Sequence, residues 1–170
     1  MIRATVRTEE SDDADLVRSV NMRAFGRPDE AALVDALRGT PGVVSLVAVA
    51  HDRLVGHILF TRVEVDGVRD SIAVAGLAPM AVLPEHQRRG IGSALVRAGL
   101  DSCREHGYRA VVVLGHPEFY PRFGFTPAAA RGLTCEWPVP PEAFMTIELE
   151  PGALAGARGV VRYRPEFAAV

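Results

Sequence analysis

The chain has 170 residues, of which 48% are hydrophobic and 24% charged, as is usual for one globular domain with a sizeable core. Its formal net charge of −2 gives no electrostatic reason to expect nucleic-acid binding, and no apolar run approaches the roughly 20 residues of a membrane-spanning helix. We therefore expect a single domain over residues 1–170, located in the cytoplasm and binding neither nucleic acid nor membranes.

The N-terminal part of the chain predicts one strand followed by two helices. Polar and apolar residues alternate over 1–7, as in a half-buried strand. Ser11-Asp12-Asp13 offers N-cap oxygens to a helix over 13–25, and a second helix over 29–38 ends at Gly39. One face of the first helix carries apolar residues at helical spacing, namely Leu16, Val20 and Ala24.

Three strands over residues 43–50, 54–65 and 71–82 follow the second helix. The first is rich in β-branched residues, and a short polar turn joins it to the second. Asp66-Gly67 is a strong hairpin signal between the second strand and the third. These features predict a three-stranded antiparallel meander.

The pattern then changes to strand, loop, helix and strand. After Pro84, a polar loop leads into a helix that begins near Gly90 or Ile91 and ends at His106-Gly107, before a short apolar strand over 110–114. Two closing strands are expected over 144–149 and 160–163. The fold class is therefore α/β (α+β): a mixed, mostly antiparallel central sheet flanked by helices, with a single parallel pairing in one βαβ unit.

The two cysteines, Cys103 and Cys135, lie far apart and form no closely spaced pair, so we expect neither a disulfide framework nor a metal site. Cys103 falls within a helical pattern and is interpreted as a small buried hydrophobic residue. All nineteen basic residues are arginine. Phosphate groups would therefore have to be bound by arginine, backbone N–H groups or hydroxyls.

A Q-x-x-G-x-G pattern over residues 87–92 lies between the third meander strand and the following helix. The first N–H groups of a helix have no intrahelical partner and carry partial positive charge, so they attract phosphate. Two glycines leave the backbone accessible, Ser93 adds a hydroxyl, and Arg88 and Arg89 add charge. The loop lacks the lysine of a Walker sequence and the third glycine of a Rossmann fingerprint. A glycine-containing turn with two solvated arginines is the alternative interpretation.

With this loop, the sequence resembles the GNAT superfamily of N-acetyltransferases, whose cofactor motif is Q/R-x-x-G-x-G/A. A second signature of that family, Y-x-x-x-G-F, corresponds to Tyr120-Pro121-Arg122-Phe123-Gly124-Phe125. Residues 120–125 together with 139–144 look most like the YhbS-like bacterial branch. The resemblance covers nearly the whole chain, because the order of the predicted elements is also similar.

The resemblance implies that the protein is an acyl-CoA-dependent N-acyltransferase with acetyl-CoA as cosubstrate and no metal. An amine of a small-molecule or peptide acceptor would attack the thioester directly, without a covalent enzyme intermediate. Tyr120 would be the general acid that protonates the departing thiolate. The resemblance also implies two groups of cofactor-binding residues: Met80, Ala81 and Val82 for the pantetheine arm, and Arg88, Arg89, Gly90, Ile91, Gly92 and Ser93 for the pyrophosphate.

The general base that deprotonates the amine is not identified by the sequence. The strand over 71–82 carries no carboxylate, although many relatives use a glutamate on the central strands. Glu64, His57 and His116 are candidates by region only, and a bound water is the preferred interpretation. The missing carboxylate favours an alternative function, a CoA-binding sensor or regulatory protein without catalysis, whereas Tyr120 argues against it.

The acceptor is not identified by the sequence either. Modification of aminoacyl-tRNA or a ribosomal protein is disfavoured because no basic run or aromatic–arginine patch is present. We expect the acceptor pocket to be formed by the helices over 13–25 and 29–38 and by the loop over 131–143. Small folds of this type often pair through exposed strand edges, so a homodimer is one expected assembly.

Overall fold

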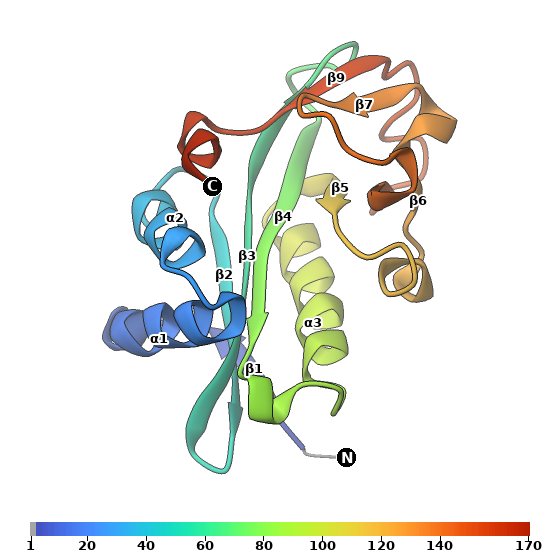
Figure 1. The fold of residues 1–170 in the computed structure, drawn as a ribbon. Helices are drawn as coiled ribbons and strands as arrows, with labels where there is room; N and C mark the ends of the chain where they lie inside the picture. The colour runs from blue at the N-terminus through green and yellow to red at the C-terminus, as the bar shows by residue number, and fades with distance from the viewer. Residues whose placement is uncertain (1–2) are drawn as a thin grey trace.

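A long twisted sheet organises the computed structural model, which describes residues 3–170 (Figure 1). Over these residues the sheet has nine strands, and three α-helices flank it. The helices are α1 (Ala14–Phe25), α2 (Asp29–Leu37) and α3 (Ile91–Glu105). The strands are β1 (Thr5–Thr8), β2 (Val44–Ala50), β3 (Arg53–Val65), β4 (Ala73–Val82), β5 (Tyr108–Leu114), β6 (Thr126–Pro127), β7 (Leu133–Cys135), β8 (Phe144–Glu148) and β9 (Gly159–Arg162).

The main path of the sheet runs β1-β2-β3-β4-β5-β8-β6, while β9 pairs with β7 and with the end of β3. The predicted meander β2-β3-β4 is antiparallel, and the predicted β4–β5 pairing is parallel. The structure thus confirms a mixed, mostly antiparallel sheet. The expectation of a single parallel pairing was wrong, because β7 and β9 also pair in parallel. β7 has only three residues, too few to show a periodic pattern.

The connection between β3 and β4 also differs from the prediction. β3 ends at Val65 and β4 begins at Ala73, so the strands are joined by a loop over 66–72 and not by a tight turn at Asp66-Gly67. Asp66 is instead engaged by the chain near β9, since its backbone N–H donates to Val160 O at 3.4 Å. A late segment of the chain therefore determines the end of this hairpin.

Helices α1 and α2 cover one face of the sheet and α3 covers the other, so that each face has its own apolar cluster (Figure 1). On α1 the packed residues are Val17 and Val20, whereas Leu16 is 54% exposed, contrary to the prediction. Val20 and Ala24 pack against the core as expected, and the buried stripe also includes Asn21, which donates to the His57 ring of β3 at 3.1 Å. Cys103 on α3 is buried as predicted.

The neighbouring strands β4 and β5 separate about halfway along β4. β4 pairs with β5 from Ala73 to Leu77, but beyond Leu77 only β3 remains beside it. β5 continues to Leu114 in its pairing with β8. At the same point β4 has a bulge, because Leu77 and Met80 lie opposite Phe60 and Ile58. The sheet therefore opens between β4 and β5 near its centre.

Candidate active site

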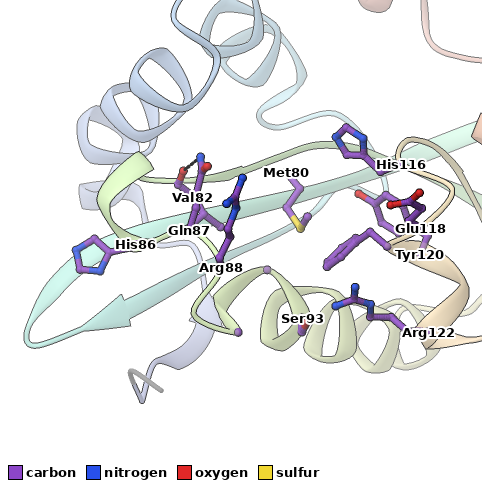
Figure 2. A pocket seen from close by; sticks show the side chains of 13 residues that line it. Met80, Val82, His86, Gln87, Arg88, Ser93, His116, Glu118, Tyr120 and Arg122 are labelled. Carbon is purple, nitrogen blue, oxygen red and sulfur yellow. Dashed lines mark hydrogen bonds between the residues drawn. The ribbon is translucent and has the colours of Figure 1, made fainter.

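A cleft of about 770 Å³ lies where β4 and β5 separate (Figure 2). Its walls are the end of β4, the beginning of α3 and the segment 116–122 that follows β5. The lining side chains and glycines are Met80, Val82, His86, Gln87, Arg88, Gly90, Gly92, Ser93, His116, Glu118, Phe119, Tyr120 and Arg122. The two sequence motifs are thus brought together across one cleft.

The beginning of α3 is open to an anion. Gly90 has the N-cap position with a φ of 85°, no side chain caps the helix, and its first turn has no acidic residue. The first intrahelical bond runs from the Ala94 N–H to Gly90 O at 3.0 Å, which leaves the N–H groups of 91–93 without helical partners. These groups and the helix dipole fit a phosphate.

Arg88 lies in a strained backbone conformation beside this helix start. Its φ is 59°, a left-handed conformation that costs a residue with a Cβ roughly 1–2 kcal/mol. Its side chain lines the cleft and extends towards Gln87 in Figure 2. The loop therefore keeps an arginine in this position at a conformational cost.

The free edge of β4 supplies main-chain groups to the same cleft. The Leu83 N–H donates to Val55 O of the β3 side at 2.9 Å, and backbone groups of successive strand residues point to alternate edges. The groups of Ala81 therefore also face β3, whereas those of Met80 and Val82 face the cleft. Val82 O accepts a hydrogen bond from Gln87 Nε2 at 3.0 Å (Figure 2).

Tyr120 lines the cleft in the segment that follows β5, next to Glu118 (Figure 2). The residue is only 6% exposed, and its ring packs edge-on against Phe119 and Phe125 at centroid distances of 5.0 and 5.6 Å. Burial raises the pKa of Tyr120 to about 12. A Cβ on Gly115 would lie 2.4 Å from Cε2 of this ring, so the glycine makes room for it. Tyr120 therefore carries a proton throughout the neutral pH range.

A second cavity of about 490 Å³, which we call the inner cavity, adjoins the cleft on the side of α1 and α2. The two share Met80, Val82, Gln87, His116 and Tyr120. The second cavity extends to Phe25 of α1, Glu30 and Leu33 of α2, and the C-terminal residues Phe167 and Val170. A third cavity, of about 310 Å³, adds Trp137 and Tyr163. The α1, α2 and 131–143 regions that were expected to form the acceptor pocket all contribute to these cavities.

Only one of the three candidate bases lies at this junction. His116 lines both cavities, whereas Glu64 pairs with Arg162 of β9 in the strand register, away from the cleft. His57 is fully buried beneath α1, between Asn21 and Ser45. Burial lowers the pKa of His57 to about 4. The positions of His57 and Glu64 therefore argue against both as bases.

The predicted cofactor residues lie in two environments. Met80, Val82, Arg88, Gly90, Gly92 and Ser93 line the cleft. The side chains of Ala81 and Ile91 are buried in the core, and Arg89 is exposed outside the lining set. Sequence reasoning assigned no role to Glu118, Glu30, Phe167 or Val170. Glu30 lies at the start of the helix predicted over 29–38, and no motif marks it or the C-terminal pair.

Over residues 3–170, no group of three or more His, Cys, Asp or Glu residues is arranged to hold a metal ion. In the same part of the chain, no helix has the length and apolar character needed to cross a membrane.

Comparisons with known proteins agree with this arrangement. The family model described as acetyltransferase (GNAT) domain matches residues 5–128. Two relatives from Escherichia coli strain K12 are described as uncharacterized N-acetyltransferases. YjhQ is 43% identical over 139 residues, which cover 79% of this chain and 76% of YjhQ. YhbS is 39% identical over 165 residues, which cover 95% of this chain and 97% of YhbS.

Two solved structures are similar over almost the whole chain. The GNAT family N-acetyltransferase YhbS from Escherichia coli, in complex with CoA, has a TM-score of 0.90 at 38% identity and covers 99% of this chain and 93% of its own. A GNAT family acetyltransferase from Brucella melitensis, in complex with acetyl-CoA, has a TM-score of 0.77 at 32% identity, with coverages of 98% and 99%. Both the family and the fold predicted from the motifs are shared with these proteins.

Proposed function

The chain belongs to the GNAT family of acetyltransferases, and on this premise we propose that it transfers an acetyl group from acetyl-CoA to an amine. The observation that carries the proposal is that two elements able to bind acetyl-CoA, the start of α3 and the free edge of β4, line the same cleft. The open start of α3 fits the pyrophosphate, and the free edge of β4 fits the amides of the pantetheine arm. The two similar structures that are complexes with CoA and acetyl-CoA support this assignment.

The cofactor-binding residues that we propose follow from these two elements. The N–H groups of Ile91, Gly92 and Ser93 would bind phosphate oxygens, while the Arg88 side chain adds positive charge. Met80 and Val82 would pair with pantetheine through their main-chain groups, and Gln87 keeps Val82 O oriented by its hydrogen bond. The exposed Arg89 would act only through longer-range charge.

Tyr120 is the proposed hydrogen-bond and proton donor to the departing sulfur. Acetyl-CoA supplies an activated carbonyl: the amine nitrogen bonds to its carbon, the C–S bond breaks, and the electron pair leaves on sulfur. The Tyr120 hydroxyl, protonated at neutral pH because burial raises its pKa to about 12, would stabilise that developing negative charge. No covalent bond to the protein is needed.

His116 is the proposed proton acceptor, directly or through a bound water, because it lines both the cofactor cleft and the inner cavity. It would remove a proton from the amine before or during attack. We expect His116→Gln to lower kcat most for strongly basic amines, which are protonated at neutral pH, and least for weakly basic amines. A merely structural role would lower kcat equally for both, and steady-state rates across such a series distinguish the two.

The cofactor site is tested with Gly92→Val. A Cβ at Gly92 has only ordinary contacts, 3.6 Å from Met80 Cε and Phe119 Cζ, so the fold should accept the change while the added methyl groups obstruct the approach of the pyrophosphate. Gly90 is less suitable because its φ of 85° would strain any replacement. Calorimetry should show acetyl-CoA binding to the wild type and a loss of at least tenfold in Gly92→Val.

Asp101→Val is the matched control, since Asp101 is an exposed residue of the same helix outside the cleft. It should retain the wild-type affinity for acetyl-CoA. If folded Gly92→Val binds acetyl-CoA with the same affinity as the wild type, the proposed cofactor site is wrong, and the proposed function is wrong with it.

A further inference from the structure

The inner cavity has an uneven distribution of polar groups. Its polar side chains are Gln87, His116, Tyr120 and Glu30. The first three also line the cofactor cleft, so they lie at the junction where the acetyl group would be transferred. Away from the junction, the side chains that line the inner cavity are apolar except for that of Glu30. A ligand in this cavity therefore meets hydrogen-bonding groups mainly at the end that faces the thioester.

The third cavity continues this apolar surface. It shares Ala78, Leu114, Phe167 and Val170 with the inner cavity, so the two are contiguous. Its remaining lining residues, Trp137 and Tyr163, have ring centroids 5.0 Å apart and planes tilted by 34°. No charged side chain lines this third cavity within the described chain. Flat aromatic walls favour a ligand that can pack against rings.

Exposed apolar residues gather at the same place. Of the five large hydrophobic residues that are exposed in the described part of the chain, Phe25, Leu114 and Val170 line the inner cavity. They come from α1, the end of β5 and the C-terminal segment. Exposed apolar surface of this kind is unfavourable in water. A ligand that covered it would gain a free energy of roughly 25 cal/mol for each Å² of apolar surface removed from water.

Glu30 has the single carboxylate side chain among the residues that line the inner cavity, and it is 5% exposed. Both of its oxygens accept hydrogen bonds from Arg27 Nε, at 3.0 and 3.1 Å. This pairing neutralises the Glu30 carboxylate. Among the described residues, the cavity therefore offers no row of free acidic groups, which a polyamine would require. It also offers few hydrogen-bonding groups for the hydroxyls of a sugar.

We infer that the acceptor is a primary amine carried on an apolar, aromatic-sized body, with its amino group at the junction beside His116 and Tyr120 and its body in the contiguous apolar cavities. The inference rests on the proposed acetyl transfer and specifies its substrate class. An arylalkylamine such as 2-phenylethylamine or tryptamine has this chemistry, whereas an amino sugar, a polyamine or a short amino alcohol does not.

The first test compares acceptors that share an aminoethyl group and differ in the attached body. 2-Phenylethylamine and tryptamine should be acetylated with a kcat/KM at least tenfold above that of ethanolamine, measured as release of free thiol from acetyl-CoA, because only the aryl body fills the apolar cavities. Spermidine and glucosamine should be as poor as ethanolamine. A preference for these polar amines would overturn the inference while leaving acetyl transfer intact.

The second test changes Phe25, an exposed apolar residue that lines the inner cavity. Phe25→Ala should raise KM for 2-phenylethylamine about tenfold, with KM for acetyl-CoA and kcat nearly unchanged. Leu16→Ala is the matched control, since Leu16 is an exposed apolar residue of the same helix that lines none of these cavities. If Phe25→Ala and Leu16→Ala give the same KM as the wild type, Phe25 contacts no acceptor and the inference fails.

A binding measurement separates this failure from that of acetyl transfer itself. Calorimetry should detect binding of 2-phenylethylamine to the protein saturated with CoA, even where turnover is slow. A protein that binds acetyl-CoA but neither binds nor acetylates an arylalkylamine has an acceptor of another class. A protein that does not bind acetyl-CoA contradicts the proposed function itself.

Discussion

Tyr120 illustrates how burial changes the pKa of a single side chain. A pKa of about 12 lies above the ~8.5 of a thiol, so complete proton transfer from the phenol to a thiolate would be uphill. The hydroxyl is better suited to stabilise the sulfur through a strong hydrogen bond while the C–S bond breaks. We therefore expect the Tyr120 hydroxyl to make a moderate contribution to the rate of acetyl transfer.

We expect Tyr120→Phe to lower kcat about 10²-fold, the lower end for a positioned acid, without changing the Kd of acetyl-CoA. The variant removes only the hydroxyl, and its ring can keep its contacts with Phe119 and Phe125. Tyr108→Phe is the control, because the Tyr108 hydroxyl donates to Gly42 O at the far end of β5 and should not affect kcat. Steady-state rates and calorimetry test both; equal kcat values for wild type and Tyr120→Phe would make Tyr120 a packing residue.

Individual site residues could be predicted from sequence only where a motif marked them. Gly92, Ser93 and Tyr120 were singled out because their motifs imply both a chemical group and a place in the fold, and all three line the cleft. Phe167 and Val170 were missed because they reach the cavity through a long-range contact of the C-terminal segment with α2, and no local pattern encodes such a contact. Glu30 was missed for the same reason.

At the scale of elements, α3 packs against β3 through glycines on both surfaces. A Cβ on Gly99 would lie 2.4 Å from Cε2 and 2.5 Å from Cζ of Phe60, a ring that is fully buried. On the strand side, a Cβ on Gly56 would be in tight contact with α3, 3.0 Å from Leu95 Cδ1 and 3.2 Å from Ile91 Cγ2. Small residues on both surfaces therefore set the distance between helix and sheet.

We expect Gly99→Ala to lower the free energy of unfolding by about 1–3 kcal/mol, despite the better helix propensity of alanine, because the added methyl overpacks the interface. Asp101→Ala is the control; it is exposed two residues further along α3 and should change stability by less than about 0.5 kcal/mol. Urea unfolding of both variants provides the measurement. A Gly99→Ala protein as stable as wild type would mean that α3 moves away from β3 at little cost.

The elements that sequence predicted well are those with strong local signals. The meander and α3 have clear periodicity and clear end signals, and their bounds differ from the prediction by only a few residues. β6 and β7 were not predicted, and Leu16 was wrongly placed on the packed face of α1. The two short strands depend on partners distant in sequence: β6 on β8 and β7 on β9.

At the scale of the molecule, a buried polar chain joins the N-terminal elements. Asn21 Nδ2 donates to His57 Nδ1 at 3.1 Å, so His57 Nε2 carries the proton and donates to Ser45 Oγ at 2.9 Å. The Ser45 hydroxyl then donates to the Glu9 carboxylate, which also pairs with Arg38. His57 is neutral in this chain, because burial lowers its pKa to about 4 and the charge of Arg38 opposes protonation further, whereas Glu9 favours it.

The pH dependence of stability follows from this neutral histidine. The folded-state pKa of about 4 lies below the ordinary value of 6.5, so between these values the unfolded chain binds a proton that the folded protein does not. The free energy of unfolding should therefore fall as pH drops from 6.5 towards 4, by up to about 3 kcal/mol.

Urea unfolding from pH 7 to pH 4.5 measures this slope, and His57→Gln should make it shallower whatever its effect at pH 7. Asp13, whose pKa is lowered by its hydrogen bond to Arg7, adds a loss of the same sign at lower pH and is unchanged in the variant. Identical slopes in both proteins would contradict the assignment to His57.

The open edge of β4 has a consequence for solubility. Unpaired strand edges usually recruit strands from other chains, and proteins protect them with short edge strands, proline or charge. β6, the edge strand at one end of this sheet, is protected in this way because it has only two residues, one of them Pro127. Met80 and Val82 need no such protection. Their edge lies in the interior of the sheet, between α3 and the segment after β5, so another chain could reach it only through the cleft. The position of this edge within the sheet, and not proline or charge, therefore limits its pairing with other chains.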